Sequence, residues 1–345
     1  MSSYALISDL PLTIERHELQ RLSHEVSSEF TRVTTIVRLW GGGEEGLGED
    51  VTYSGEAHDR LHAVGAGLPL AGEWTIDSFS HHLDGVALFP EPPEMPAFGD
   101  YRRWAFESAA LDLALRQAGR SLAESLGRES NPVRFVVSTR ASIEHLRELL
   151  AVHPATRLKL DPVPEWTREL VAELARMGGV ETLDLKGQYK GTVVDNPADP
   201  ALYRLVAEAF PEAWLEDPEL TAETEGVLEP HRDRITWDAP IHSVTDVEAL
   251  PFPPRTINIK PSRFGPIRRL FETYDYCAER AIAMYGGGQF ELGVGRGQIQ
   301  YLASLFHPDM PNDVAPGGYN TGPLDPRLPD SPLEPAAAPS GFRWG

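Results

Sequence analysis

Five short apolar runs lie between residues 157 and 262: RLKLD (157–161), VETLDLKG (180–187), AWLEDP (213–218), ITWDAP (235–240) and INIKPS (257–262). Each carries a charged residue at or near its end, and these are Lys159, Asp184, Glu216, Asp238 and Lys260. They follow one another at steps of 25, 32, 22 and 22 positions, which suit one strand plus one crossover helix. The spacing predicts a parallel barrel with all five side chains at the mouth formed by the strands' C-terminal ends.

Three of these five side chains are carboxylates, which repel one another where they converge. Two carboxylates about 4 Å apart repel by about 4 kcal/mol at an effective dielectric constant of ~20. Three such pairs cost about 12 kcal/mol, comparable to the ~5–15 kcal/mol stability of a whole domain. A divalent cation removes that cost, and oxygen ligands without Cys or His favour Mg²⁺ over Zn²⁺. The alternative is that each acid caps the helix after its strand.

This ordered set resembles the enolase superfamily, in particular its muconate-lactonizing-enzyme branch. That branch has a Lys-x-Lys motif on the second barrel strand, here Arg157-Leu158-Lys159. Acids that bind the metal end strands three, four and five, and a lysine follows strand six. The resemblance, which covers nearly the whole chain, implies the metal ligands Asp184, Glu216 and Asp238 and the catalytic residues Lys159 and Lys260.

The resemblance also implies a fold and a chemistry. The fold is α/β: a modified TIM barrel, (β/α)7β, at residues 99–320, with an N-terminal α+β capping domain at residues 1–98. The chemistry is removal of the proton α to a substrate carboxylate, which gives an enediolate stabilised by Mg²⁺. Lysines on both faces of the α-carbon favour a racemase or epimerase. The alternatives are o-succinylbenzoate-synthase-like dehydration, cycloisomerisation, and a catalytically degenerate binding protein.

Outside the five runs, the N-terminal pattern is less regular. Residues 3–12 predict a strand, and the polar residues 12–30 predict a loop or a frayed helix. Residues 32–53 predict a hairpin whose turn is the glycine run Gly41–Gly43, because two strand-like segments flank it.

The remaining elements alternate between helix and strand up to a weak end. A helix is expected at residues 101–119, and strand eight is faint, around residues 312–318. The tail at residues 321–345, rich in Pro and Ala, is expected to wrap the surface or the capping domain.

Two positions depart from the family pattern. Lys186 stands where the family often has Asn. A lysine that faces the metal there would compete with the cation or bind a substrate anion, but we expect Lys186 to point away. Ala239 stands where the family has Glu, so the support of Asp238 is in doubt. Further substrate-binding candidates come from the motif, from the end of strand one and from the glycine-rich loop after strand seven: Arg157, Ser138, Arg140, Gln289 and Glu291.

Composition argues against some classes of partner, whereas a small-molecule carboxylate substrate is what the resemblance implies. The net charge of −21 argues against nucleic acid and against an anionic membrane. The single cysteine, Cys277, excludes an intrachain disulfide and agrees with a cytoplasmic location. The first residues, MSSYALISDLPL, show neither a basic n-region nor a long apolar run, so we expect no signal peptide or membrane span. The family is often dimeric or octameric, which leaves a homo-oligomer open.

Overall fold

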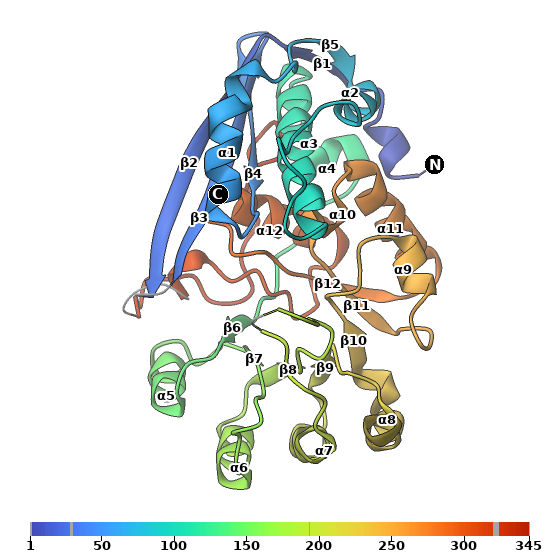
Figure 1. The fold of residues 1–345 in the computed structure, drawn as a ribbon. Helices are drawn as coiled ribbons and strands as arrows, with labels where there is room; N and C mark the ends of the chain where they lie inside the picture. The colour runs from blue at the N-terminus through green and yellow to red at the C-terminus, as the bar shows by residue number, and fades with distance from the viewer. Residues whose placement is uncertain (1, 28–29, 193, 320–323, 345) are drawn as a thin grey trace.

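The computed structural model describes residues 2–27, 30–192, 194–319 and 324–344, and it places an antiparallel N-terminal part above a parallel sheet (Figure 1). The strands of the N-terminal part are β1 (Pro11–Ile14), β2 (Arg16–Ser27), β3 (Phe30–Gly41), β4 (Glu44–Asp50) and β5 (Gly72–Thr75). Its helices are η1 (Tyr4–Leu6), α1 (Gly55–Val64), η2 (Gly65–Gly67), α2 (Ile76–Leu83), α3 (Ala97–Gln117) and α4 (Leu122–Leu126).

The predicted hairpin is confirmed as β3 and β4, which pair in antiparallel register around a two-residue turn. Gly42 and Gly43 form that turn with φ angles of 59° and 81°. Two consecutive positive φ angles suit glycine, because side chains with a Cβ rarely adopt them. The hairpin therefore follows from local sequence alone.

Two expectations for the first 30 residues are wrong. Residues 16–27, expected as a loop or a frayed helix, form β2, which pairs with β3 from Arg16 opposite Trp40 to Ser27 opposite Phe30. Most of its side chains are exposed or half-buried, so its sequence lacks an apolar face, and backbone bonds to β3 decide its conformation. The strand expected at residues 3–12 begins only at Pro11, because the preceding residues form η1.

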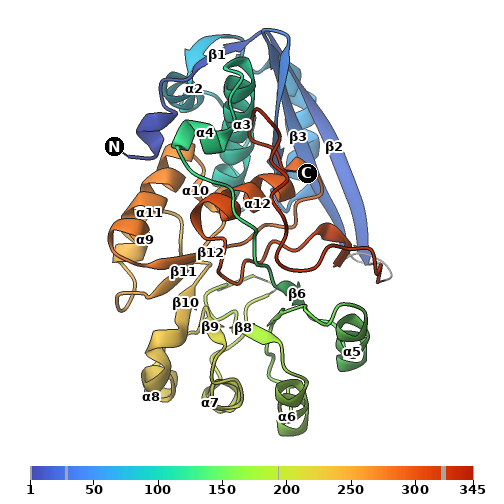
Figure 2. The same ribbon diagram turned by 180° about the vertical axis from the view of Figure 1, so that it is seen from behind.

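The C-terminal part is the predicted barrel, with parallel strands in the order β12-β11-β10-β9-β8-β7-β6. These strands are β6 (Val137–Thr139), β7 (Leu158–Leu160), β8 (Val180–Asp184), β9 (Trp214–Glu216), β10 (Ile235–Trp237), β11 (Thr256–Ile259) and β12 (Ala283–Gly286). The helical elements are α5 (Ile143–Val152), α6 (Arg168–Met177), α7 (Pro200–Ala209), α8 (Ala222–Leu228), η3 (Glu229–Arg234), α9 (Val244–Glu248), α10 (Pro261–Phe264), α11 (Ile267–Glu279), α12 (Val294–Phe306) and η4 (Gly317–Tyr319). Figure 2 shows α5 to α8 on the outside of the strands.

The gap between the two edge strands is bridged where the sequence predicted strand eight. Asn312 forms a parallel bridge with Phe135, just before β6, and Asp313 forms one with Gly287, just after β12. The Asn312 carbonyl accepts the Val136 N–H at 2.8 Å. Because these two bridges are shorter than a regular strand, the sequence pattern of strand eight is faint. They nevertheless place β7 and β11 four positions apart in an eight-membered ring.

A buried histidine supports this closing segment. The Asn312 side-chain oxygen accepts the Gly286 N–H at 2.6 Å and lies 2.7 Å from Nδ1 of His307. His307 is 5% exposed. Burial lowers the pKa of His307 from 6.5 to about 4, because a charged imidazole is poorly solvated there. The closed barrel therefore holds a neutral imidazole.

We expect this histidine to make the protein less stable in mild acid. Below pH 6.5 the unfolded chain takes up a proton that the folded chain refuses until about pH 4. The free energy of unfolding should therefore fall by about 2 kcal/mol more between pH 7 and pH 5 than it does in a His307→Gln variant. Urea titrations at both pH values measure this difference, and equal losses in the two proteins would contradict it.

The two parts share one apolar core. Buried side chains of α3, such as Phe106, join the same cluster as Leu39 of β3 and Leu215 of β9. The tail at residues 321–345 includes 321–323 and 345, which lie outside the described residues. Its described end contacts the N-terminal part, where the Phe342 N–H donates to Asp112 at 2.7 Å. The boundary between residues 98 and 99 stays a prediction, as does the barrel's end at residue 320, which is not described.

None of the helices in the described ranges combines the length and the apolar character that are needed to cross a bilayer.

Candidate active site

Acidic side chains meet at the C-terminal ends of β8 and β9. Asp184 and Glu216 are register partners on these adjacent parallel strands, so their side chains point to the same side of the sheet. Asp238 lies two residues beyond Thr236, the register partner of Glu216 on β10. Alternation along the strand turns Asp238 to that same side, and all three carboxylates are fully buried.

Lys159 joins two of these carboxylates from β7. Its Nζ lies 2.5 Å from Glu216 Oε1 and 3.4 Å from Asp184 Oδ2, and its side chain is 2% exposed. Burial favours the neutral amine, but Glu216 and Asp184 outweigh it and hold the pKa of Lys159 well above its ordinary value. These carboxylate neighbours therefore keep Lys159 an ammonium.

Lys186 points into the cluster, so the expectation that it points away is wrong. Its Nζ contacts Asp184 Oδ2, and its backbone N–H donates to Asp184 Oδ1 at 3.2 Å. The backbone at Lys186 has a φ of 57°, a left-handed conformation that ends the extended backbone just after β8. Burial alone would lower the pKa of Lys186, but Asp184 raises it above its ordinary value.

Asp238 is held by three side chains. Lys260 Nζ donates to Asp238 Oδ2 at 2.8 Å, Arg263 Nη1 donates to Oδ1 at 2.5 Å, and the Tyr189 hydroxyl donates to Oδ2 at 2.7 Å. Gly287 leaves room for Lys260, because a Cβ there would lie 2.8 Å from Lys260 Cε. Lys260 therefore reaches the cluster from β11, opposite Lys159.

Asp217, which sequence reasoning missed, completes the cluster. Its carboxylate accepts the backbone N–H groups of Asp238 and Ala239, both at 2.8 Å. It therefore supports the segment where the family's Glu is replaced by Ala239. Burial, together with the Asp238 charge, raises the pKa of Asp217 to about 7. The doublet Glu216-Asp217 was visible, but strand alternation sends the second residue outward, and only its φ of 50° turns it in.

The cluster contains four buried carboxylates and four cations, three of them buried and the fourth, Lys186, 13% exposed. The carboxylates are Asp184, Glu216, Asp217 and Asp238, and the cations are Lys159, Lys186, Lys260 and Arg263. The chain has only four lysines among its 31 basic residues, and three of them are in this set. These cations offset part of the repulsion among the carboxylates. From the sequence alone, a divalent cation was expected to remove that repulsion.

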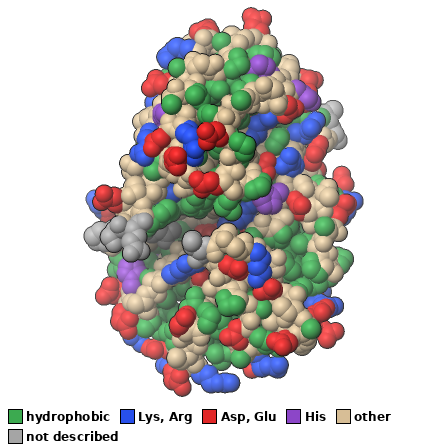
Figure 3. Space-filling model, in the orientation of Figure 1, with side chains coloured by type: hydrophobic (Ala, Val, Ile, Leu, Met, Phe, Trp, Pro, Cys, Tyr) green, Lys and Arg blue, Asp and Glu red, His purple; other side chains and the backbone are tan. Residues whose placement is uncertain are grey.

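A cavity of about 630 Å³ opens beside this cluster and contains two of the predicted substrate-binding residues. Its lining includes Ser138 and Arg140 at the end of β6, and Arg296 in the first turn of α12. Asp313, 3.7 Å from Lys159 Nζ, also lines it, so the cavity adjoins the cluster. Val26 at the end of β2 forms part of its rim. Figure 3 shows a hollow between the upper and lower parts on this face of the molecule.

Gln289 and Glu291 face the N-terminal part. The Gln289 side chain bonds the hydroxyls of Tyr53 and Tyr101, and Glu291 Oε1 accepts the Gln289 N–H at 2.6 Å. Glu291 Oε2 lies 3.1 Å from Arg296, which lines the cavity. These two candidates thus connect the loop after β12 to the N-terminal part, and Glu291 adjoins the cavity-lining residues Arg296 and Gly288.

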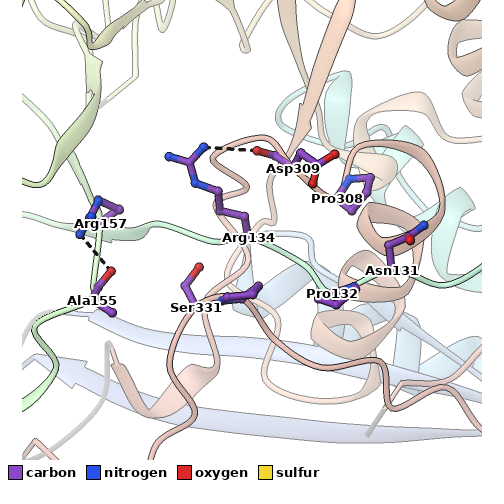
Figure 4. A pocket seen from close by; sticks show the side chains of 9 residues that line it. Asn131, Pro132, Arg134, Ala155, Arg157, Pro308, Asp309 and Ser331 are labelled. Carbon is purple, nitrogen blue, oxygen red and sulfur yellow. Dashed lines mark hydrogen bonds between the residues drawn. The ribbon is translucent and has the colours of Figure 1, made fainter.

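Arg157 does not join the cluster. It precedes β7, so it lies at the opposite end of the strand from the carboxylates, and its Nη1 donates to the Ala155 carbonyl at 3.1 Å. It lines another cavity of about 580 Å³, together with Arg134 and Ser331 (Figure 4). Of the motif Arg157-Leu158-Lys159, only Lys159 faces the carboxylates.

Two family models match the chain. The model described as "Domain of unknown function (DUF8230) C-terminal domain" matches residues 129–321, and the one for the N-terminal domain matches residues 5–125. A relative from Amycolatopsis named N-succinylamino acid racemase is 27% identical over 308 residues, or 84% of this chain and 80% of the relative. A relative from Bacillus subtilis strain 168 named o-succinylbenzoate synthase is 28% identical over 269 residues, or 72% and 71%.

Solved structures show the same fold. A member of the enolase superfamily from Listeria innocua is 19% identical, with a TM-score of 0.66 over 88% of this chain and 86% of that one. Muconate cycloisomerase from Pseudomonas fluorescens is 17% identical, with a TM-score of 0.65 over 97% and 93%.

Proposed function

Because the chain belongs to the DUF8230 family and has the fold of the enolase superfamily, we propose that it is an enzyme that removes the proton α to a carboxylate. Racemisation or epimerisation of a small carboxylic acid is the reaction that we favour. The observation that carries this proposal is the pair of buried lysines, Lys159 on β7 and Lys260 directly after β11. Four positions apart in an eight-membered ring, these strands face each other across the barrel.

Opposed lysines suit inversion at carbon. One neutral Nζ takes the proton from one face of the α-carbon, and the electrons of the broken C–H bond delocalise into the substrate carboxylate. The other ammonium then gives a proton to the opposite face, so the two lysines exchange protonation states with each turnover. Since Lys159 is held as an ammonium by Glu216 and Asp184, it is the proton donor of the resting arrangement.

The carboxylates fit a divalent cation. Oxygens of Asp184, Glu216 and Asp217 lie within 4.8 Å of one another, and Mg²⁺ prefers such an all-oxygen set. This oxygen group contains Asp184 and Glu216 of the three ligands that the sequence suggested, but not Asp238. We keep Asp238 as the third ligand, with Asp217 fixing it through its backbone N–H. When bound, Mg²⁺ would neutralise negative charge that develops on the substrate carboxylate.

Cationic side chains at the cavity suit an anionic substrate. Arg296 lines the cavity, and its Nε is buried without a hydrogen-bond partner in the described part of the chain. Its Nη2 pairs with Glu291 at 3.1 Å, but the unbonded Nε–H leaves one donor for a substrate carboxylate. Arg140 is half exposed at the same cavity but pairs with Asp161 at 2.7 Å. We therefore place a substrate carboxylate nearer Arg296, with Ser138 as a neutral neighbour.

Elimination is the second candidate, because relatives named o-succinylbenzoate synthase are as similar as those named N-succinylamino acid racemase. Both reactions begin with the same proton abstraction. They differ in whether the second lysine returns a proton to carbon.

We expect the protein to exchange substrate α-protons with solvent. N-acyl amino acids and other carboxylic acids, incubated with protein and Mg²⁺ in deuterated water, should gain deuterium at the α-carbon, as followed by NMR. Exchange accompanied by inversion identifies the racemase, and exchange accompanied by loss of water identifies the elimination. If none of these acids exchanges while the protein binds them, the protein is a binding protein and not an enzyme.

A further inference from the structure

The Lys186 ammonium pairs with Asp184, a carboxylate that a divalent cation would need as a ligand. Its ammonium contacts Asp184 Oδ2 and lies 3.7 Å from Asp161 Oδ2. Asp184 also belongs to the oxygen cluster that fits a cation, together with Glu216 and Asp217. The same oxygen cannot serve an ammonium and a divalent cation at full strength, because the two cations repel each other at such short range.

A second carboxylate, Asp161, lies close to Lys186. Asp161 Oδ1 is buried and has no hydrogen-bond partner among the residues that the structure describes. Asp161 lies at the cavity, and its other oxygen pairs with Arg140. The lysine stem is flexible, whereas its backbone is fixed by the N–H bond to Asp184. A small swing of the stem would therefore move the ammonium from one carboxylate to the other.

We propose that Lys186 is a resident counter-ion that leaves Asp184 for Asp161 when a divalent cation binds. This inference rests on the metal site of the proposed function. In the absence of a divalent cation, the ammonium offsets the charge of a buried carboxylate whose other cationic neighbour, Lys159, lies 3.4 Å away and is shared with Glu216. In its presence, Asp161 receives the displaced charge. The chain thus folds with the site assembled. The free energy gained on cation binding is reduced by the free energy needed to move Lys186.

Calorimetric titration of Mg²⁺ into the full chain, without substrate, tests this proposal. Lys186→Gln should bind Mg²⁺ on the order of 100-fold more tightly than the parent, because it removes the competing charge. Asp161→Asn should bind about 10-fold more weakly, because the displaced ammonium loses its second partner. Lys190→Gln is the matched control: that lysine is half exposed, pairs with Glu219, and should leave the affinity unchanged. Equal affinities of the parent and Lys186→Gln would overturn the proposal.

A measurement on the parent alone covers the case in which Lys186→Gln does not fold. With four lysines in the chain, amine-reactive labelling read by mass spectrometry follows each of them separately. Mg²⁺ should raise the labelling of Lys186 several-fold and leave that of Lys190 unchanged. Labelling of Lys186 that does not respond to saturating Mg²⁺ would overturn the proposal. Neither readout involves turnover, so a protein that moves Lys186 but exchanges no α-protons would refute only the proposed function.

Discussion

Lys159→Ala and Lys260→Ala are each expected to lower the rate of inversion at the α-carbon by about 10³-fold. General acid–base catalysis contributes roughly 10²- to 10⁴-fold, and inversion needs both groups. Each variant should keep exchange from the enantiomer whose proton faces the remaining lysine, and lose exchange from the other. Chiral chromatography and NMR of both enantiomers in deuterated water measure these rates.

Lys190→Ala serves as the control for this pair, because Lys190 is exposed and pairs with Glu219 away from the cluster. A second control separates chemistry from folding, since Lys159→Ala leaves Glu216 without its partner. Breaking such a buried pair costs about 3–5 kcal/mol of stability. Lys159→Arg keeps the charge but cannot act as a base, so it should fold and remain inactive. Full turnover by either alanine variant would refute the assignment of two catalytic lysines.

Arg32→Met is expected to cost about 3–5 kcal/mol of stability, because it removes the guanidinium that joins the N-terminal sheet to the barrel. Arg32 is fully buried on β3. It donates to the carbonyls of Val51 and Thr52 at 2.7 and 2.8 Å, and to those of Gln289 and Phe290 at 2.8 and 3.1 Å. Its loss removes this donor from the carbonyls of Val51, Gln289 and Phe290, the last two in the loop after β12. The Thr52 carbonyl still lies 2.9 Å from His58 Nε2.

The same variant should also weaken substrate binding, because Phe290 lines the cavity. Thermal denaturation and the substrate KM measure the two effects. Arg38→Met, on the same strand, is the matched control: Arg38 is 32% exposed and pairs with Glu45, so its loss should cost less than about 1 kcal/mol. If both variants melt at the parent temperature, Arg32 does not join the two parts.

Much of the fold could be predicted from short-range pattern. The resemblance to the enolase superfamily and the barrel fold are confirmed by the relatives and by the solved structures. The five charged residues were proposed as site residues because each lies at or near the end of a short apolar run, and parallel strands end at one face. The hairpin at Gly42 and Gly43 was found because two glycines with positive φ mark a tight turn.

The errors occurred where partners distant in the chain decide a local conformation. β2 has no apolar face of its own, and its strand forms because β3 supplies hydrogen bonds along its length. Arg32 gives no signal in the sequence, since its partners are backbone carbonyls as far away as Phe290. The strand expected at residues 3–12 gave way to η1, whose neighbour Ser3 bonds Asp275 of α11.

The sequence by itself determined the barrel, its closing segment and the positions that carry charge, because strand period and spacing are local properties of the chain. Only the tertiary structure decided which charges meet. It turned Asp217 into the cluster through a left-handed backbone, placed the Lys186 ammonium on Asp184, and left Arg157 at the far end of its strand. Ion pairing depends on side-chain direction at distances of a few ångströms, and residue spacing along a sequence does not specify that direction.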